Sequence, residues 1–95
     1  MAAYIIADVT VTDADQMALY REWSTRAMQE HAAKILVRGG AFEVLEGPWT
    51  PSRLVLLEFE TLEKAKAFYH SDTYAHARKL RENAGVMRMV LVQGA

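Results

Sequence analysis

Two carboxylates and an arginine are the residues whose types and placement best suit acid/base chemistry. Asp8 and Glu58 lie at similar distances from the expected starts of two apolar strands, Tyr4–Val11 and Arg53–Glu60. If these strands are parallel neighbours, the two carboxylates lie close together, and Arg38, on the strand before Arg53–Glu60, reaches Glu58. Two carboxylates in a partly apolar cavity repel each other, so the pKa of one rises unless the arginine compensates. Such a pair predicts proton transfer to and from a small ligand.

The same three residues also fit a structural role, an ion-pair network at the rim of a cavity or at a dimer seam, because such networks perturb pKa values without catalysing a reaction. His31, near the end of a predicted helix that faces the sheet, is a further candidate for a general base, or else a helix-end residue paired with a carbonyl or water. His70 and His76 are six residues apart. That spacing does not place two ligands on one helix face, so no metal site is predicted, and no cofactor.

These candidates depend on a strand, Arg53–Glu60, that is apolar on both faces. Successive side chains of a strand point to opposite sides, so Leu56 lies on one face and its neighbours Val55 and Leu57 lie on the other. A strand of this kind must be covered on both sides. The expected last strand, Val86–Val92, has the same character.

Periodicity and capping residues predict the order of the elements. Helices are expected from Thr12 to about His31, and after Thr61 with a break and restart at Ser71. The pair Gly39-Gly40 predicts a bulge or a bend in the second strand. The expected strands are Tyr4–Val11, Lys34–Val37 continued by Phe42–Glu46, Arg53–Glu60 and Val86–Val92. This order is the ferredoxin-like βαββαβ arrangement, an α+β fold with an antiparallel sheet of order 4-1-3-2 and both helices on one face.

The helices of such a fold cover only one face of the sheet. The opposite face would expose an apolar patch larger than a monomer normally tolerates, so another surface must pack against it. A second copy of the chain, packed sheet to sheet, is the simplest cover, and a homodimer is therefore predicted. The residues expected on that face are Ile6, Leu54, Leu56, Met87, Met89 and Leu91.

Composition limits the classes of function. The chain has 95 residues, which fits one domain over residues 1–95, and 52% of them are hydrophobic. Eleven basic and twelve acidic residues give a net charge of −1, which provides no field to attract nucleic acid or an anionic membrane. There is no cysteine, which excludes disulfides, a thiolate nucleophile and cysteine-ligated metals. Without a secretory signal or a run long enough to span a bilayer, a cytoplasmic location is expected.

Several short motifs make the chain similar to a known family. They are Arg38-Gly39-Gly40, Val44–Trp49, Pro51, Arg53–Val55, Glu58-Phe59, Phe68–Ser71 with Tyr74, the opening Ala3–Ala7 and the closing Val90–Val92. Together they resemble the small bacterial proteins of the domain of unknown function 1330 family, over nearly the whole chain. The resemblance implies a dimeric α+β barrel, in which two ferredoxin-like subunits pack their sheets together and enclose a cavity. That superfamily includes cofactor-independent monooxygenases, muconolactone isomerases and haem-degrading enzymes, and a shared fold does not transfer their chemistry.

Three functions fit these expectations. The first is a cofactor-independent enzyme that performs acid/base or oxygenation chemistry on a small organic acid or aromatic, in a cavity lined by Asp8, Arg38, Glu58 and one or two aromatic residues. The second is a binding or accessory protein with the same cavity and no turnover. The third is a structural dimer in which the polar residues fix the register of the sheets. A cavity with room for a ligand separates the first two from the third.

Overall fold

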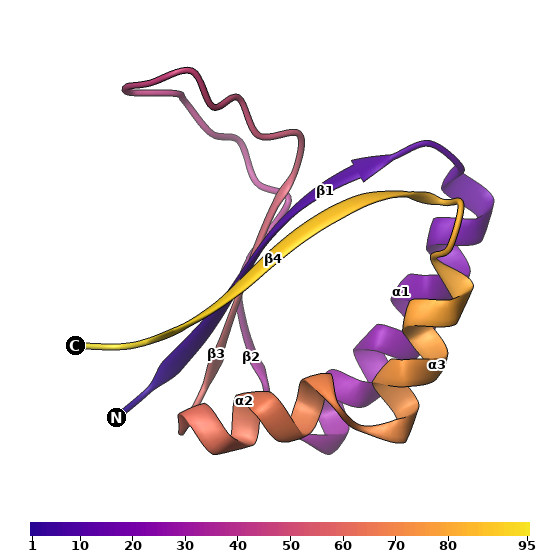
Figure 1. Cartoon of the computed structure of the whole chain (residues 1–95), viewed down its shortest axis with the longest axis vertical. Helices are drawn as coiled ribbons and strands as arrows, with labels where there is room; N and C mark the ends of the chain where they lie inside the picture. The colour runs from indigo at the N-terminus through magenta and orange to yellow at the C-terminus, as the bar shows by residue number, and fades with distance from the viewer.

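One sheet and one layer of helices make up the computed structural model, which describes all 95 residues (Figure 1). The sheet has the strand order β2-β3-β1-β4, and every neighbouring pair is antiparallel. The predicted ferredoxin-like α+β fold and its strand order are therefore confirmed. The elements are β1 (Ala3–Val11), α1 (Ala14–Glu30), β2 (Lys34–Arg38), β3 (Leu54–Phe59), α2 (Leu62–Tyr69), α3 (Asp72–Leu80) and β4 (Gly85–Gln93).

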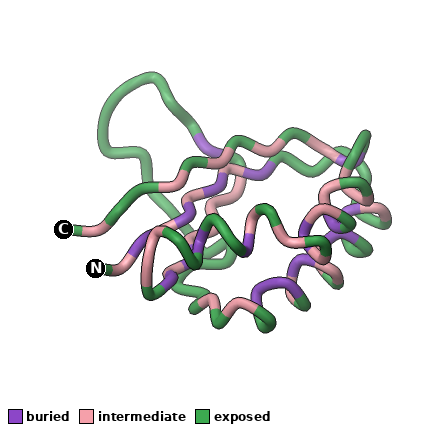
Figure 2. Tube along the Cα trace, turned by 60° about the horizontal axis from the view of Figure 1, so that its bottom comes forward, coloured by how far each residue is buried: buried purple, intermediate pink, exposed green.

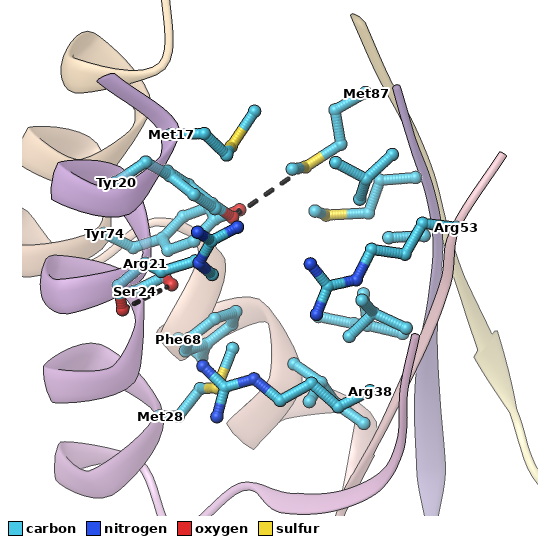
Figure 3. Close-up of a pocket in the computed structure, with 16 residues that line it drawn as sticks. Met17, Tyr20, Arg21, Ser24, Met28, Arg38, Arg53, Phe68, Tyr74 and Met87 are labelled. Atoms are coloured by element: carbon cyan, nitrogen blue, oxygen red, sulfur yellow. Dashed lines mark hydrogen bonds between the residues drawn. The ribbon is translucent and has the colours of Figure 1, made fainter. Parts of the chain in front are cut away.

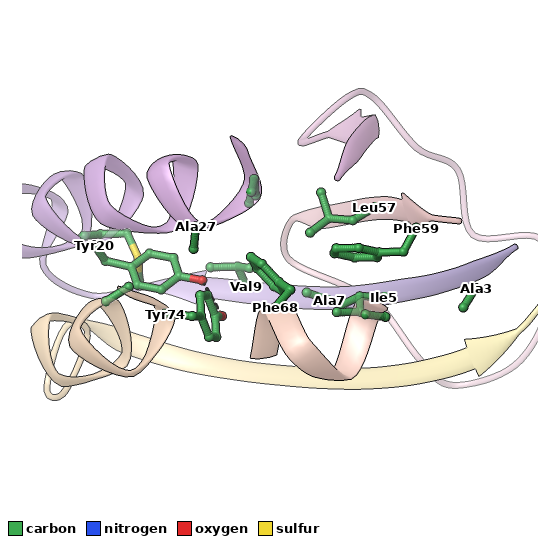
Figure 4. Close-up of a cluster of buried hydrophobic side chains, with 14 of the residues drawn as sticks. Ala3, Ile5, Ala7, Val9, Tyr20, Ala27, Leu57, Phe59, Phe68 and Tyr74 are labelled. Carbon is green, nitrogen blue, oxygen red and sulfur yellow. Dashed lines mark hydrogen bonds between the residues drawn. The ribbon is translucent and has the colours of Figure 1, made fainter. Parts of the chain in front are cut away.

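Strand β1 is a central strand of the sheet, and its successive side chains point alternately to the covered and the uncovered face. Ile5, Ala7 and Val9 are buried beneath the helices, while the residues between them are only partly covered. On the neighbouring strand, Leu57 and Phe59 are buried on the same side (Figure 4). The core therefore lies between the helices and one face of the sheet, as the alternation of apolar residues predicts.

Three aromatic rings join the sheet to the second helical segment. The ring centroids of Phe59 and Phe68 are 5.2 Å apart, and those of Phe68 and Tyr74 are 4.7 Å apart. The predicted break between α2 and α3 allows this arrangement, because Ser71 caps α3 by accepting a hydrogen bond from the backbone N–H of Tyr74. Each half of the broken helix thus contributes a buried ring to one core.

The N-cap of helix α1 lies one residue after Thr12, the residue at which the helix is expected to begin. Asp13 is the N-cap, not Thr12, because its side chain accepts a hydrogen bond from the backbone N–H of Gln16 at 3.1 Å. The helix ends at Glu30, with His31 as its C-cap, close to the predicted end. The buried side chains of this helix are Met17, Tyr20, Ser24, Ala27 and Met28.

The two faces of β4 are the reverse of the predicted ones. The register with β1 places Met87 opposite Val9 and Met89 opposite Ala7, both of which face the helices. Met87, Met89 and Leu91 therefore pack on the core, and the prediction that they lie on the uncovered face is wrong. The small side chain of Ala7 leaves space that the long, flexible thioethers of Met87 and Met89 occupy only in part. The uncovered face carries Val86, Val90 and Val92, which are 58%, 59% and 46% exposed.

Residues 39–53 form a long irregular arm between β2 and β3, and the arm projects away from the sheet (Figure 1). The predicted continuation of the second strand over Phe42–Glu46 is wrong, because these residues have no strand structure. A register shift between Ile35 and Val37, followed by a left-handed backbone at Gly39 with φ of 72°, turns the chain out of the sheet. Most of the arm is exposed, as Figure 2 shows, and Pro51 is buried at its end.

Gly85 provides a test of the close packing of β1 and β4. A Cβ atom at this position would overlap the carbonyl oxygen of Thr10 and lie 3.2 Å from the Cα atom of Val11. Gly85→Ala should therefore lower the free energy of unfolding by about 1–3 kcal/mol. Gly40→Ala, where the added methyl group meets no atom within 4 Å, is the matched control and should change it by less than about 0.5 kcal/mol. Urea denaturation measures both, and an unchanged midpoint for Gly85→Ala would contradict the close approach.

Candidate ligand-binding cavity

A cavity lies between helix α1 and the covered face of the sheet, with aromatic rings from α2 and α3 completing its lining (Figure 3). Twelve of its 16 lining residues are hydrophobic. An apolar chamber with a few polar groups is the usual character of a small-molecule site. The lining consists of Ile5, Ala7, Val9, Met17, Tyr20, Arg21, Ser24, Met28, Arg38, Arg53, Val55, Leu57, Phe68, Tyr74, Met87 and Met89.

The cavity is small. The volume open to water is about 50 Å³. One water molecule needs roughly 10–15 Å³ of such space, so about three to five waters fit, or the apolar part of a small ligand. Methionine and arginine side chains in the lining are flexible, and their movement would admit a larger molecule.

A pair of tyrosine hydroxyls lies on the cavity wall. The hydroxyls of Tyr20, on α1, and Tyr74, on α3, are 2.7 Å apart. The Tyr20 hydroxyl also lies 3.8 Å from the sulfur of Met87, which is a weak acceptor. Burial raises the pKa of Tyr20, and burial together with the neighbouring Tyr20 raises the pKa of Tyr74. Both hydroxyls therefore stay protonated at neutral pH and act as hydrogen-bond donors rather than as bases.

Three arginines bring positive charge to the cavity. They are Arg21 from α1, Arg38 from the end of β2 and Arg53 from the residue before β3, and Figure 3 shows all three side chains directed into the space between helix and sheet. Arg38 donates a hydrogen bond to the hydroxyl of Thr25 at 3.1 Å. No Asp, Glu or His lines the cavity. The ion pairs of the chain lie elsewhere and do not involve these arginines; they are Arg26–Glu22 and Lys64–Glu60.

Local structure explains how each arginine reaches the cavity. Arg53 precedes Val55 by two residues and so shares its face of the sheet. Arg38 lies opposite Val55 in the pairing of β2 with β3, on the same face. Arg21 lies one helical turn before the buried Ser24. The period of the strand is therefore a signal that could have identified Arg53, whereas Arg21 has no signal that distinguishes it from a solvated helix residue.

Asp8 lies on the uncovered face of β1, where it binds the end of the arm. Its Oδ1 accepts a hydrogen bond from the backbone N–H of Ser52 at 2.9 Å, and its Oδ2 accepts one from the indole N–H of Trp49 at 3.3 Å. The backbone hydrogen bond from Ser52 is the largest cause that lowers the pKa of Asp8 below its usual value. Asp8 is thus an ionised acceptor for the arm, and it is not among the residues that line the cavity.

The predicted proximity of Asp8 and Glu58 is wrong. Strands β1 and β3 are antiparallel, not parallel, so Asp8 lies opposite Leu54. Glu58 lies opposite Tyr4, where its hydrogen bond and its charge raise the pKa of the Tyr4 hydroxyl. At about 3.4 Å per residue, the four residues from Tyr4 to Asp8 separate the carboxylates by about 14 Å along the strands. Arg38 lines the cavity on the helix side of the sheet, so its predicted approach to Glu58 is also wrong.

His31 lies at the C-terminal end of α1 and is not part of the cavity lining. Its ring makes an edge contact with the ring of Phe68, with centroids 6.2 Å apart. No group of three His, Cys, Asp or Glu side chains that could hold a metal ion occurs in the structure. None of the helices combines the length and the apolar character needed to cross a membrane.

Comparison with known proteins identifies the family and the fold. A family profile described as "Domain of unknown function (DUF1330)" matches residues 2–95, which confirms the resemblance noted from the motifs. A search of curated proteins found no match. Among solved structures, the chain is similar to RPA0582, a protein of unknown function from Rhodopseudomonas palustris, with a TM-score of 0.77 at 17% identity over 99% of this chain and 82% of that chain.

Two further structures share the fold. One is a dimeric protein of unknown function with a ferredoxin-like fold from Bacteroides fragilis, with a TM-score of 0.56 at 13% identity over 98% of this chain and 96% of that chain. The other is SnoaB, a cofactor-independent oxygenase from Streptomyces nogalater, with a TM-score of 0.58 at 10% identity over 99% of this chain and 93% of that chain. At these identities the similarity shows the fold and not the activity.

The tyrosine pair makes stability depend on pH on the alkaline side. Because the pKa values of Tyr20 and Tyr74 are raised in the folded protein, the unfolded chain loses these protons first. Their contribution to stability is complete below about pH 10 and is lost as the pH rises from there toward the folded pKa values. In the double variant Tyr20→Phe, Tyr74→Phe, the free energy of unfolding should therefore fall less steeply above about pH 10 than in the unmodified protein. Urea denaturation across this range measures the slopes, and equal slopes would contradict the prediction.

Proposed function

Because this chain belongs to the domain of unknown function 1330 family, whose description assigns no activity, we propose its function from the cavity: the protein binds a small, largely apolar organic acid as its anion. The observation that supports this proposal is the set of arginines, Arg21, Arg38 and Arg53, that line an otherwise apolar chamber without acidic partners. The predicted ligand, a small organic acid or aromatic, is thereby narrowed to an acid, and the site that we propose for it lies on the helix side of the sheet and not in a cavity between two packed sheets.

Guanidinium groups without acidic partners beside an apolar chamber favour an anion over a neutral ligand. Two unit charges about 4 Å apart attract each other by roughly 4 kcal/mol at an effective dielectric constant of 20, several times more than in water. A guanidinium group can also donate two parallel hydrogen bonds to one carboxylate, which fixes its orientation. The apolar walls would take the hydrocarbon part of the ligand. The tyrosine pair would offer one donor, because only one of its two hydroxyl protons is used in the Tyr20–Tyr74 hydrogen bond and the sulfur of Met87 is a weak acceptor for the other.

The uncovered face of the sheet is the basis of a second part of the proposal, namely that the protein is a homodimer. Ile6, Leu56 and Val90 form one row across that face, since Ile6 is paired with both neighbours. An apolar face of this kind requires a cover, and a second copy of the chain, packed sheet to sheet, supplies one. The protein from Bacteroides fragilis with this fold is described as dimeric, which supports a dimer here. Glu58 and its neighbour Tyr4 would then lie at the seam and help to fix the register.

A second candidate function is cofactor-independent oxygenation of the bound acid. The fold shared with SnoaB, a cofactor-independent oxygenase, favours it. The cavity offers no general base for this reaction, because its lining has no carboxylate or imidazole and both of its tyrosines stay protonated. A substrate would therefore have to enter already ionised, with the arginines stabilising the negative charge. Aerobic incubation with a candidate acid, followed by measurement of oxygen consumption, separates catalysis from binding alone.

Benzoate is a suitable first probe, and benzamide is its neutral counterpart of nearly equal shape. Isothermal titration calorimetry should show that benzoate binds more tightly than benzamide. Arg53→Gln should weaken benzoate binding by about tenfold or more, because a charged hydrogen bond is lost. Arg26→Gln is the matched control, since Arg26 lies on α1 but pairs with Glu22 away from the cavity, and it should leave the affinity unchanged. Equal affinity for the two probes would contradict the proposed function.

The homodimer has a separate test in sedimentation equilibrium. The chain should sediment as a dimer, and Leu56→Lys combined with Val90→Lys should convert it to a monomer, because both substitutions place charge in the middle of the apolar face. Ala18→Lys, at an exposed position of α1, is the control and should leave the dimer intact. A monomer for the unmodified chain at micromolar concentration would exclude this assembly.

A further inference from the structure

We infer that Asp8 and Gly39 are positioning residues for Arg53: together they hold the end of the arm so that the Arg53 guanidinium enters the cavity. The inference rests on the proposed function in one respect, since it takes Arg53 as a ligand-binding group. It assigns a role to the Arg-Gly-Gly and Gly-Pro-Trp motifs of the arm, which the cavity alone does not explain.

The backbone around Arg53 is held from β1 on two sides. The Asp8 carboxylate accepts the N–H of Ser52, one residue before Arg53, at 2.9 Å. The N–H of Val9, the residue after Asp8, donates to the carbonyl oxygen of Arg53 at 2.8 Å. The Ser52 hydroxyl also bonds that of Thr10 at 2.8 Å. Three consecutive residues of β1 thus fix the backbone from which the Arg53 side chain leaves.

Asp8 also restrains the arm farther from the sheet. Its second carboxylate oxygen accepts the indole N–H of Trp49 at 3.3 Å, and Pro51, between Trp49 and Arg53, is buried. The Asp8 carboxylate therefore holds both ends of the segment from Trp49 to Ser52. Pro51 lies within this segment, and its fixed φ limits the conformations that the segment can adopt. Arg88 of β4, opposite Asp8 in the register, is the charged side chain that faces it and favours its ionised form.

Gly39 determines the path of the Arg53 side chain. Its N–H donates to the carbonyl oxygen of Leu54 at 2.8 Å, which brings the end of β2 against the start of β3. A Cβ atom on Gly39 would lie 3.0 Å from Cζ and 3.1 Å from Nη2 of Arg53, and it would overlap Nε. The guanidinium therefore crosses the backbone at Gly39, where a side chain would displace it. With φ of 72°, this position also favours glycine on conformational grounds.

Three glycines of the arm separate these two effects of Gly39. Gly47 has a similar φ of 85° but open space around its Cβ position, so Gly47→Ala tests backbone strain alone. Gly40 has open space and no left-handed backbone, so Gly40→Ala tests neither effect. Gly39→Ala adds displacement of Arg53 to the strain. A change that appears in Gly39→Ala and in neither control is therefore due to Arg53.

The first experiment requires no ligand. In proton–nitrogen NMR spectra of the arginine Nε–H groups, the signal of Arg53 is identified by its absence in Arg53→Gln. We expect this signal to move to the position of a free, solvated arginine in Asp8→Ala and Gly39→Ala. It should stay in place in Gly40→Ala, Gly47→Ala and Glu58→Ala; Glu58 is a carboxylate on the same face of the sheet as Asp8, on the neighbouring strand and four residue pairs away. An unmoved signal in both Asp8→Ala and Gly39→Ala overturns the inference.

The second experiment is a double-mutant cycle with benzoate as the probe. Asp8→Ala should weaken binding by about fivefold in the unmodified background and by less than about twofold in the Arg53→Gln background, because Asp8 acts through Arg53. Asp8→Asn, which keeps one acceptor oxygen for Ser52, should restore part of the affinity. Equal losses in the two backgrounds would show that Asp8 acts on the whole fold and would overturn its positioning role. If benzoate fails to bind, the proposed ligand class fails, and the NMR signal still decides the inference.

Discussion

The antiparallel register between β1 and its two neighbours is the constraint on which the other features depend. It places Ala7 between Val55 and Met89 on the helix side, and Asp8 between Leu54 and Arg88 on the other side. A shift of one residue would exchange the faces, moving the cavity lining to the outside and Asp8 into the core. Because the core is packed only on the helix side, such a shift is strongly opposed by the burial of apolar surface.

The cavity is a consequence of the same constraint. Its sheet wall contains a small residue, Ala7, in the middle of β1, where a larger side chain would fill the space beneath α1. The opposite wall contains Tyr20, whose hydroxyl bonds Tyr74 and so is held at the surface of the chamber. Arginines reach this space from a helix, from a strand end and from the arm, and none of them meets an acid there. This positive charge without an acidic partner is the basis of the proposed anion site.

Sequence reasoning predicts the framework well and the polar site poorly. Capping residues and periodicity identify the helix boundaries and the break at Ser71 because these depend on neighbouring residues in the chain. The position of Asp8 relative to Glu58 depends instead on strand direction, and taking the strands as parallel placed two distant carboxylates together. The faces of β4 were reversed for a related reason, since Met87 and Val86 are both apolar and only the register distinguishes them. Arg53 was overlooked because its path over Gly39 is a contact between separate segments.

Thioethers make up much of the apolar surface around the cavity, since Met17, Met28, Met87 and Met89 all line it and the chain has five methionines. Methionine side chains are unbranched and have three rotatable bonds, so they change conformation at little cost in free energy. Their polarizable sulfur atoms pack well against many kinds of group. A wall of this kind would select only weakly for the shape of a ligand. For the acid ligand that we propose, discrimination would then depend on the charged end, and proteins that differ only in this wall would bind different hydrocarbon groups through the same arginines.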